Sequence, residues 1–346
     1  MKILYAIQGT GNGHLSRAKD VIPAISARAE VDILISGIQA DIELPFEVKY
    51  RYKGMSFIFG KQGGVDLWQT FKKNKAKRVY NEIKSCPVEN YDLVINDFEP
   101  ISAWACFFKG VKCISLSHQC AMMSPKVPRP NFKDWLGWTI LKYYAPTKEK
   151  YGFHFKKYDD NIFTPVIRQD IRDLEVCNGD HYTVYLPAYS DKKIIKVLTK
   201  IKNVKWHVFS KHSDKTFQSE NVFIQPINGD AFGKSMATSK GVLCGAGFET
   251  PAEALFLGKK LMVIPMKSQY EQHYNAQALK EMGVPVIAKL KKKHAHHIKN
   301  WVTKSKLIHV YFPDQTQFIV DKVIENYISS TQLILKNEFE PQLFID

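Results

Sequence analysis

The chain of 346 residues is poor in cysteine and contains no C-x-x-C pair. Its six cysteines are scattered, mostly through apolar runs, so we expect reduced, buried thiols and neither a disulfide framework nor a zinc site. No stretch approaches about 18 uninterrupted apolar residues, so no membrane-spanning helix is expected. The N-terminus reads as a first strand and lacks the features of a signal peptide. We therefore predict a cytoplasmic protein.

Acidic residues are in deficit, with 34 Asp and Glu against 49 Lys and Arg, which gives a formal net charge of +15. The basic residues form no recognised nucleic-acid module, so nucleic acid is not the expected partner. An anionic substrate or an anionic membrane surface explains the charge better. A basic run at 71–84 and an aromatic, lysine-flanked helix within 125–158 are candidate membrane or acceptor surfaces. A solvated helix face and packing on a sheet are their respective alternatives.

A dinucleotide fingerprint is also absent. The glycine loop at 9–13 follows a predicted strand at 2–8, but His14 stands where G-x-G-x-x-G needs its third glycine. No acidic residue ends the next strand, 31–36, so a nicotinamide cofactor is not expected. The three histidines at 294–297 lack a carboxylate partner and helical spacing, which favours a solvated turn over a metal site. The sequence gives no indication of an oligomeric state.

Strand and helix patterns alternate along the whole chain, which predicts an α/β protein with parallel sheets. The length suits two domains. The most informative stretch is 242–276, where a short apolar strand runs into Gly245-Ala246-Gly247. We expect a helix after this turn, with Thr250 as its N-cap, Pro251 at its first position and Glu253 in its first turn.

This arrangement suits a ligand that carries both phosphates and hydroxyls. A helix N-terminus with free N–H groups favours an anion. The Glu253 carboxylate can accept two hydrogen bonds from a ribose, and Glu271 with Gln272 can do the same for a hexose. The alternative is an ordinary strand-turn-helix unit with a solvated polar loop.

The stretch resembles the donor-binding signature of GT-B glycosyltransferases of the MurG-like and UDP-glycosyltransferase group. It departs from that signature in Lys260 and in Glu271. The N-terminal loop resembles a G-x-G-x-G-H-x-x-R motif of a MurG-like subgroup, and residues 97–100 resemble its D-F-x-P motif. The matching residues are Gly9, Gly11, Gly13, His14 and Arg17 in the N-terminal loop, and Gly247, Glu253, Gly258, Pro265, Glu271, Gln272, Asn275 and Ala276 in the donor stretch.

The resemblance implies a GT-B fold, α/β with two Rossmann-like domains whose parallel sheets face each other across a cleft. The N-terminal acceptor domain would span 1–170 and the donor domain 180–325, with a C-terminal helix of about 326–346 packing back on the first. The implied activity is transfer of a sugar from a nucleotide-diphosphate donor, UDP-sugar first, to a hydroxyl acceptor. The expected acceptor is a cell-envelope glycan, a glycolipid or a lipid-linked intermediate, which would bring the protein to the inner face of the plasma membrane.

The implied mechanism is inverting and needs neither cofactor nor metal, because Ala246 stands where common retaining enzymes carry a glutamate. Two catalytic residues are implied, with His14 or Asp97 as the base; the alternative is that His14 caps its helix. Acceptor contacts are expected at Arg17, Glu99 and His118. Donor contacts are expected at Gly11, Gly13, Ser210, Lys211, Ile227, Gly245, Ala246, Gly247, Phe248, Glu249, Thr250, Glu253, Glu271 and Gln272.

Three other functions stay open at this point. A nucleotide-sugar epimerase of the same fold would convert the donor without any acceptor. A non-catalytic sugar-nucleotide or polysaccharide-binding protein would bind a donor and release no nucleotide. A nucleic-acid binder, the weakest of the three, would show tight binding with a steep salt dependence.

Overall fold

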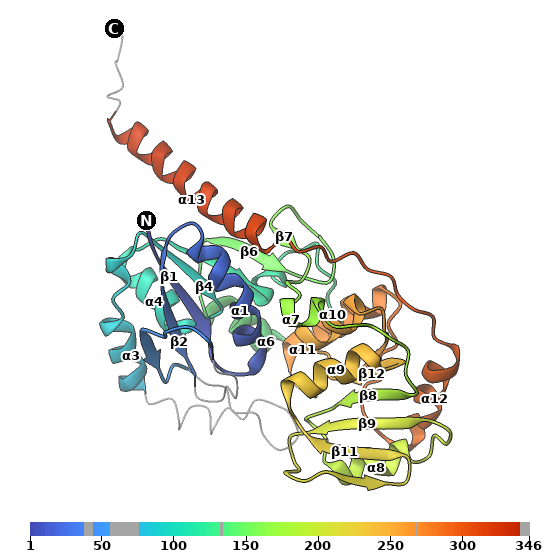
Figure 1. Ribbon diagram of the computed structural model, residues 1–346. Coiled ribbons are helices and arrows are strands. Elements are labelled where there is room, and N and C mark those ends of the chain that lie inside the picture. Colours follow the sequence, from blue (N-terminus) through green and yellow to red (C-terminus); the bar gives the residue numbers. More distant parts are fainter. Residues whose placement is uncertain (38–43, 56–75, 132–133, 268, 340–346) are drawn as a thin grey trace.

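The structure is a computed structural model that describes residues 1–37, 44–55, 76–131, 134–267 and 269–339, the last seven of these by backbone alone. It contains two separate sheets, each flanked by helices (Figure 1). Predicted features within 38–43 and 56–75, including the start of the basic run at 71–84, lie outside the described residues.

The first sheet is parallel throughout and has the order β3-β2-β1-β4-β5-β6-β7. β1 is an inner strand, between β2 and β4, and is almost entirely buried, because a strand covered on both faces must be apolar on both. Its strands are β1 (Lys2–Gln8), β2 (Glu30–Ser36), β3 (Tyr50–Tyr52), β4 (Leu93–Asp97), β5 (Cys113–Ser117), β6 (Glu149–Phe153) and β7 (Ile162–Phe163). Its helices are α1 (Asn12–Ser26), α3 (Ala76–Ser85), η1 (Val88–Asn90), α4 (Pro100–Lys109), α5 (His118–Ala121) and α6 (Trp135–Tyr143).

The second sheet has the order β10-β11-β9-β8-β12-β13 and is parallel except for β10 at its edge. Its strands are β8 (His181–Tyr185), β9 (Lys205–Ser210), β10 (Phe217–Ser219), β11 (Val222–Pro226), β12 (Gly241–Cys244) and β13 (Lys260–Val263). α7 (Gln169–Arg172) precedes this sheet. Its helices are α8 (Asp191–Leu198), α9 (Gly229–Thr238), α10 (Glu249–Phe256), α11 (Tyr270–Glu281), η2 (Lys292–His294) and α12 (Ala295–Lys304).

The last helix, α13 (Thr316–Phe339), returns to the first sheet. It packs on α1 through an apolar stripe that includes the buried Val320 and Val323. An ion pair of 2.9 Å between Arg28 and Asp321 fastens the two helices. The helix therefore begins well before the boundary expected near residue 326; the other predicted domain limits stay predictions. No helix among the described residues is long and apolar enough to cross a membrane.

Most predicted strands are present within a few residues, and the differences are local. The strands β3, β6 and β10 were not predicted, and β7 is only two residues long. α10 begins at Glu249 with Phe248 at its N-cap, so the N-cap prediction for Thr250 is wrong. Pro251 still lies in the first turn, where its missing N–H leaves no helical hydrogen bond unmade. The histidines of 294–297 lie in η2 and at the start of α12, so the predicted turn is partly helical.

Candidate active site

His14 and Asp97 form a hydrogen-bonded pair where β1 and β4 end. His14 lies in the first turn of α1, just after Gly11, whose φ of 97° suits a glycine. Its Nδ1 is 2.8 Å from Oδ1 of Asp97, the last residue of β4. A carboxylate only accepts hydrogen bonds, so Nδ1 carries the proton and Nε2 keeps its lone pair. The pair therefore has the tautomer that a general base needs.

Arg17 lies one turn further along α1, fully buried, and pairs with carboxylates from both halves of the protein. Its Nη2 donates to the two oxygens of Asp97 at 2.8 and 2.7 Å, and its Nη1 pairs with Glu249 of α10. Burial raises the pKa of Asp97, but Arg17 and His14 outweigh it and hold that pKa below its usual range. Both terminal nitrogens of Arg17 are thus engaged, which indicates a positioning role, and the acceptor contact expected from the sequence stays a prediction.

Glu249 is the first residue of α10 and faces the N-terminal loop. A side chain at Gly13 would put its Cβ 3.1 Å from Cγ of Glu249, so a larger residue there would press on the Glu249 side chain. Burial raises the pKa of Glu249 to about 7; the nearby Arg17 opposes the rise, and the Glu253 and Asp97 charges add to it. The guanidinium of Arg17 cannot fully neutralise the carboxylates of both Asp97 and Glu249. Of these two carboxylates, Glu249 is therefore the one that takes up a proton near neutral pH.

Gln119 was not among the predicted site residues, and it connects the two halves of the site. It lies in α5, where the chain leaves β5, and is 5% exposed. Its Nε2 is 3.3 Å from Nε2 of His14 and donates to Oε2 of Glu271 at 3.2 Å. Its Oε1 is buried and has no hydrogen-bond partner among the described residues. The sequence signal was its place just after a predicted strand, at the edge where sites of α/β proteins form.

The turn after β12 is fixed by hydrogen bonds from its own surroundings. Gly245 N–H donates to Tyr185 O at 3.1 Å, and Ala246 N–H donates to Oε1 of Gln272 at 3.2 Å. The same Gln272 oxygen accepts from Met266 N–H at 2.9 Å. Two N–H groups expected to bind the donor are therefore used within the protein, and Gln272 shapes this turn.

His118 is buried between the two halves of the molecule. Its Nδ1 donates to Phe153 O at 2.8 Å, and its Nε2 is 2.7 Å from Oδ1 of Asn275. The ring stacks on Phe248 with centroids 3.8 Å apart and planes 8° apart. Burial lowers the pKa of His118. His118 and Phe248 thus pack against each other at the domain interface, and the acceptor and donor contacts expected of them stay predictions.

Glu99 has a structural role in the protein, and its predicted acceptor contact stays a prediction. Its carboxylate caps α4 by accepting from Ile101 N–H at 2.7 Å and Ser102 N–H at 2.6 Å. The Ser36 and Ser102 hydroxyls complete its shell. It is wholly buried, and burial raises its pKa. The D-F-x-P motif therefore supplies one carboxylate to the site and one to the helix that follows.

Glu253 is buried and bound by a cation from the other half of the protein. Arg168 Nε donates to its Oε1 at 2.8 Å. Burial raises the pKa of Glu253, and Arg168 opposes that rise. A ribose hydroxyl would have to share this carboxylate with Arg168.

The predicted donor contacts after β9 and β11 lie apart from the glycine turn. β8 and β9 stand between β12 and β11 in the sheet. Ile227 N–H donates to Ser210 O at 3.0 Å, and the Ser210 hydroxyl donates to Asp191 at 2.7 Å, while Lys211 is exposed. These residues therefore gather at one end of the strand edge, whereas Gly247 and Thr250 lie at the other.

Comparisons with known proteins agree with this architecture. The sequence model of the family described as Glycosyl transferase family 1 matches residues 1–338. No curated protein sequence matches the chain.

Similar solved structures include the glycotransferase of kitacinnamycin, at 12% identity over 97% of this chain and 98% of that one, with a TM-score of 0.55. UGT2 of Phytolacca americana, solved with UDP-2-fluoro-glucose and pterostilbene, has 12% identity over 97% and 98%, with a TM-score of 0.56. A UDP-N-acetylglucosamine 2-epimerase has 12% identity over 95% and 96%, with a TM-score of 0.53. Likeness at such identities concerns the fold alone, and it confirms the predicted GT-B fold.

Proposed function

The chain belongs to glycosyl transferase family 1, and from this premise we propose that it moves a sugar from a nucleotide-diphosphate donor to a hydroxyl acceptor. A UDP-sugar is the donor we expect. The observation that carries the proposal is the arrangement around His14. Asp97 accepts from Nδ1 of His14, which leaves the lone pair on Nε2. That nitrogen lies 3.3 Å from Gln119, whose amide also donates to Glu271 of the other domain. A base from one domain thus meets a sugar-binding carboxylate from the other.

The proposed reaction is a single displacement with inversion. Nε2 of His14 takes the proton of the acceptor hydroxyl while that oxygen attacks the anomeric carbon, and the bond to the diphosphate breaks. The resulting imidazolium lies against the ionised Asp97, which stabilises it. We propose that cationic side chains and free N–H groups of the protein stabilise the departing diphosphate without a metal.

Arg17 positions this base. It donates to both oxygens of Asp97 and so holds the carboxylate that accepts from Nδ1 of His14. Its Nη2 also lies 3.3 Å from that nitrogen. We therefore assign Arg17 to orienting the pair of His14 and Asp97.

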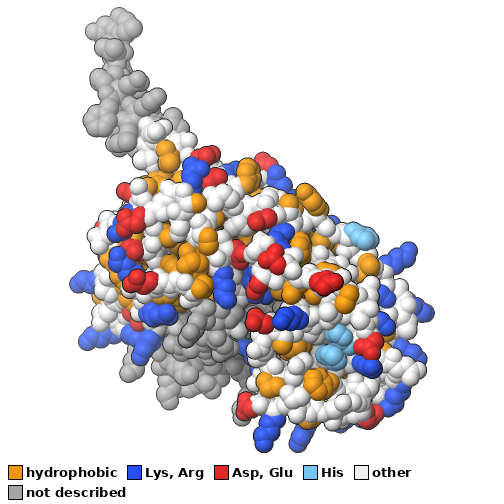
Figure 2. All heavy atoms as spheres, viewed as in Figure 1, with side chains coloured by type: hydrophobic (Ala, Val, Ile, Leu, Met, Phe, Trp, Pro, Cys, Tyr) orange, Lys and Arg blue, Asp and Glu red, His pale blue; other side chains and the backbone are white. Residues whose placement is uncertain are grey.

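A glycolipid or lipid-linked acceptor remains part of the proposal, together with contact to an anionic membrane. Its support is α6, where Trp135 is 76% and Tyr143 52% exposed. Lys and Arg side chains are spread over both domains on the face shown in Figure 2. Co-sedimentation with anionic vesicles at low salt, compared for wild type and Trp135→Ala, tests this part; equal amounts in both pellets would contradict it.

The main test is turnover with a panel of nucleotide sugars and hydroxyl acceptors. We expect His14→Ala and Asp97→Asn to lower kcat by at least about a hundredfold, the usual contribution of a general base. His309→Ala, at an exposed histidine outside the site, is the matched control. Turnover of His14→Ala within a few-fold of wild type would refute the base assignment.

Two further arms separate the alternative functions. Conversion of the donor in the absence of acceptor would indicate an epimerase. Donor binding without nucleotide release under any condition would indicate a binding protein. Thermal shift against UDP-, GDP-, dTDP-, ADP- and CMP-sugars, with Glu253→Gln alongside, identifies the nucleotide, because a ligand that binds only the folded state stabilises it.

A further inference from the structure

A row of three hydrogen-bond contacts crosses the domain interface at His118. Its Nδ1 lies 2.8 Å from Phe153 O at the end of β6, and its Nε2 lies 2.7 Å from Oδ1 of Asn275 in α11. Nδ2 of Asn275 donates to Ala246 O, in the glycine turn after β12, at 3.1 Å. We call these three contacts the His118 link. Both side chains are at most 1% exposed, so the contacts are shielded from solvent.

The His118 link ends in a backbone carbonyl on either side, and a carbonyl oxygen only accepts hydrogen bonds. Three contacts therefore need three donated hydrogens. The Asn275 amide has its donors at one end only, so it supplies one hydrogen to the link, whichever way the amide is turned. A neutral imidazole supplies one more, which leaves one contact without a hydrogen. Only the imidazolium form of His118, which donates from both ring nitrogens, completes the link.

A neutral His118 ring leaves two acceptors face to face at one of the three contacts. With the ring proton on Nδ1, the lone pair of Nε2 meets Oδ1 of Asn275 at 2.7 Å. If the amide turns, its oxygen instead meets Ala246 O at 3.1 Å. His118 and Phe153 belong to the first domain, whereas Asn275 and Ala246 belong to the second. The contact between His118 and Asn275 is thus the one that can lengthen without disturbing either domain.

Charged groups on the neighbouring helices act on the His118 ring in opposite directions. Burial lowers the pKa of His118 and is the largest effect, and the Arg17 cation of α1 adds to it. The carboxylate of Glu271, one turn before Asn275 on α11, opposes this change, as do the two hydrogen-bond acceptors. The imidazolium therefore forms on the acidic side of the usual histidine range, and the link is incomplete above it.

The aromatic neighbours of His118 add no competing charge. The ring of His154 lies 5.1 Å away between centroids, and burial holds its pKa well below the usual value. Its Nδ1 accepts from Phe155 N–H at 2.9 Å, as a neutral ring can. On another side, Phe248 stacks on His118 at 3.8 Å and offers an imidazolium its electron-rich face.

The His118 link lies beside the proposed base. Gln119, the next residue of α5, donates to Glu271 at 3.2 Å and lies 3.3 Å from Nε2 of His14. The short helix α5 thus contacts α11 through two successive residues, His118 and Gln119. A longer contact at the first residue would also move the second, and with it the amide that faces His14.

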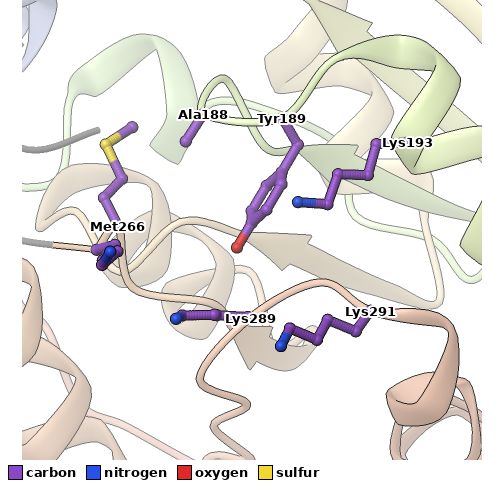
Figure 3. A pocket seen from close by; sticks show the side chains of 7 residues that line it. Ala188, Tyr189, Lys193, Met266, Lys289 and Lys291 are labelled. Carbon is purple, nitrogen blue, oxygen red and sulfur yellow. The ribbon is translucent and has the colours of Figure 1, made fainter. Parts of the chain in front are cut away.

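The glycine turn is held by its own domain on the other side. Oε1 of Gln272 accepts from Ala246 N–H and from Met266 N–H. Met266 also lines a cavity of about 380 Å³, where Figure 3 shows it together with Tyr189. Every described residue that lines this cavity belongs to the second domain. The His118 link, in contrast, ties the Ala246 carbonyl to the first domain.

We propose that protonated His118 is a positioning residue, which fixes α11 and the glycine turn against the first domain, and that loss of its proton loosens this contact. The inference concerns the contact between the domains and goes beyond the proposed function. Only its consequence for donor binding would rest on that function.

The first test is an NMR titration of the full chain, labelled with ¹³C and ¹⁵N in its histidine rings, from pH 4 to 8. The signals absent from the His118→Gln spectrum belong to His118. We expect both of its ring nitrogens to be protonated at the acidic end. Asn275→Ala should lower its pKa by about one unit, because one charge-assisted hydrogen bond is lost. Asn300→Ala, at an exposed asparagine, is the control and should leave the pKa in place.

Asn275→Asp changes the same contact in the opposite direction. It keeps the shape of the side chain and should raise the pKa of His118 by about one unit or more, because a carboxylate beside Nε2 favours the imidazolium. This variant keeps the test decisive if Asn275→Ala does not fold. A His118 ring that stays neutral down to pH 4, or a pKa that moves in neither variant, would overturn the proposal.

The second test measures the loosening. Melting temperatures of His118→Phe, Asn275→Ala and the double variant are compared with wild type one pH unit below and one above the pKa found by NMR. Such a double-mutant cycle isolates the interaction between the two side chains. Below the pKa, the double variant should lose about 3 °C less than the two single variants together, and above it the losses should add. Equal coupling at both pH values would refute the loosening. Neither test uses a nucleotide sugar, so failure of the proposed function would leave both results standing.

Discussion

Replacing Glu249 by Gln should make the protein less sensitive to pH between about 4.5 and 8. The carboxyl titrates near 4.5 in the unfolded chain and at about 7 in the folded protein. Because the folded pKa is the higher one, the folded state binds this proton more tightly, so its stabilising effect is complete below about 4.5 and is lost as pH rises through about 7. The difference between these two pKa values corresponds to about 3 kcal/mol of unfolding free energy. Glu249→Gln keeps the side chain neutral throughout and removes this loss.

The measurement is urea unfolding of wild type and variant at several pH values from 4.5 to 8. The quantity of interest is the difference in unfolding free energy between the two proteins, since titrations that both share then cancel. We expect this difference to move in favour of the variant by about 3 kcal/mol as pH rises, since the pKa of about 7 already includes the opposing effect of Arg17. Glu175→Gln, at an exposed glutamate, is the control. A difference that stays constant with pH would refute the assignment of a near-neutral proton to Glu249.

Two further predictions concern the contacts between the domains. Gln119→Ala removes the amide that lies 3.3 Å from His14 Nε2 and donates to Oε2 of Glu271, so it should lower kcat/KM about tenfold or more. An unchanged kcat/KM in this variant would contradict the role given to this contact. Arg168→Met leaves the buried Glu253 without its cation and should cost about 3 kcal/mol, seen as a lower melting temperature. Adding Glu253→Gln should recover most of that loss, and a melting temperature that does not recover would show that Arg168 acts in another way.

The sequence predicts the architecture well because the signals it uses are local. Strands such as β1 and β4 are apolar runs that end in glycine or a carboxylate, and a parallel sheet brings such ends to one edge. The contact between His14 and Asp97 follows from that rule, and the structure has it at 2.8 Å. Helix starts were less reliable, since Thr250 and Phe248 are both compatible with the start of α10 and packing decides between them.

The sequence could not predict which residues pair with the buried charges. The motifs indicate that Arg17 and Glu99 are polar residues near a site, but they do not show whether each side chain points to solvent or into the protein. That choice depends on which residues from distant segments meet them: Glu249 reaches Arg17, and Ser36 reaches Glu99. Gln119 was overlooked for the same reason, because its importance comes from two partners far away in the chain.

Several polar contacts between the domains use residues of the donor stretch. Arg17 holds Glu249, Arg168 holds Glu253, His118 contacts Asn275, and Gln119 donates to Glu271. A donor that hydrogen-bonds to Glu253 would share this carboxylate with a cation from the first domain, which takes only its Oε1. The ion pair can then stay intact while the donor binds, and breaking it would instead cost several kcal/mol. On this reasoning, the interdomain ion pairs hold the two domains together on either side of the bound donor and set how the base faces the sugar.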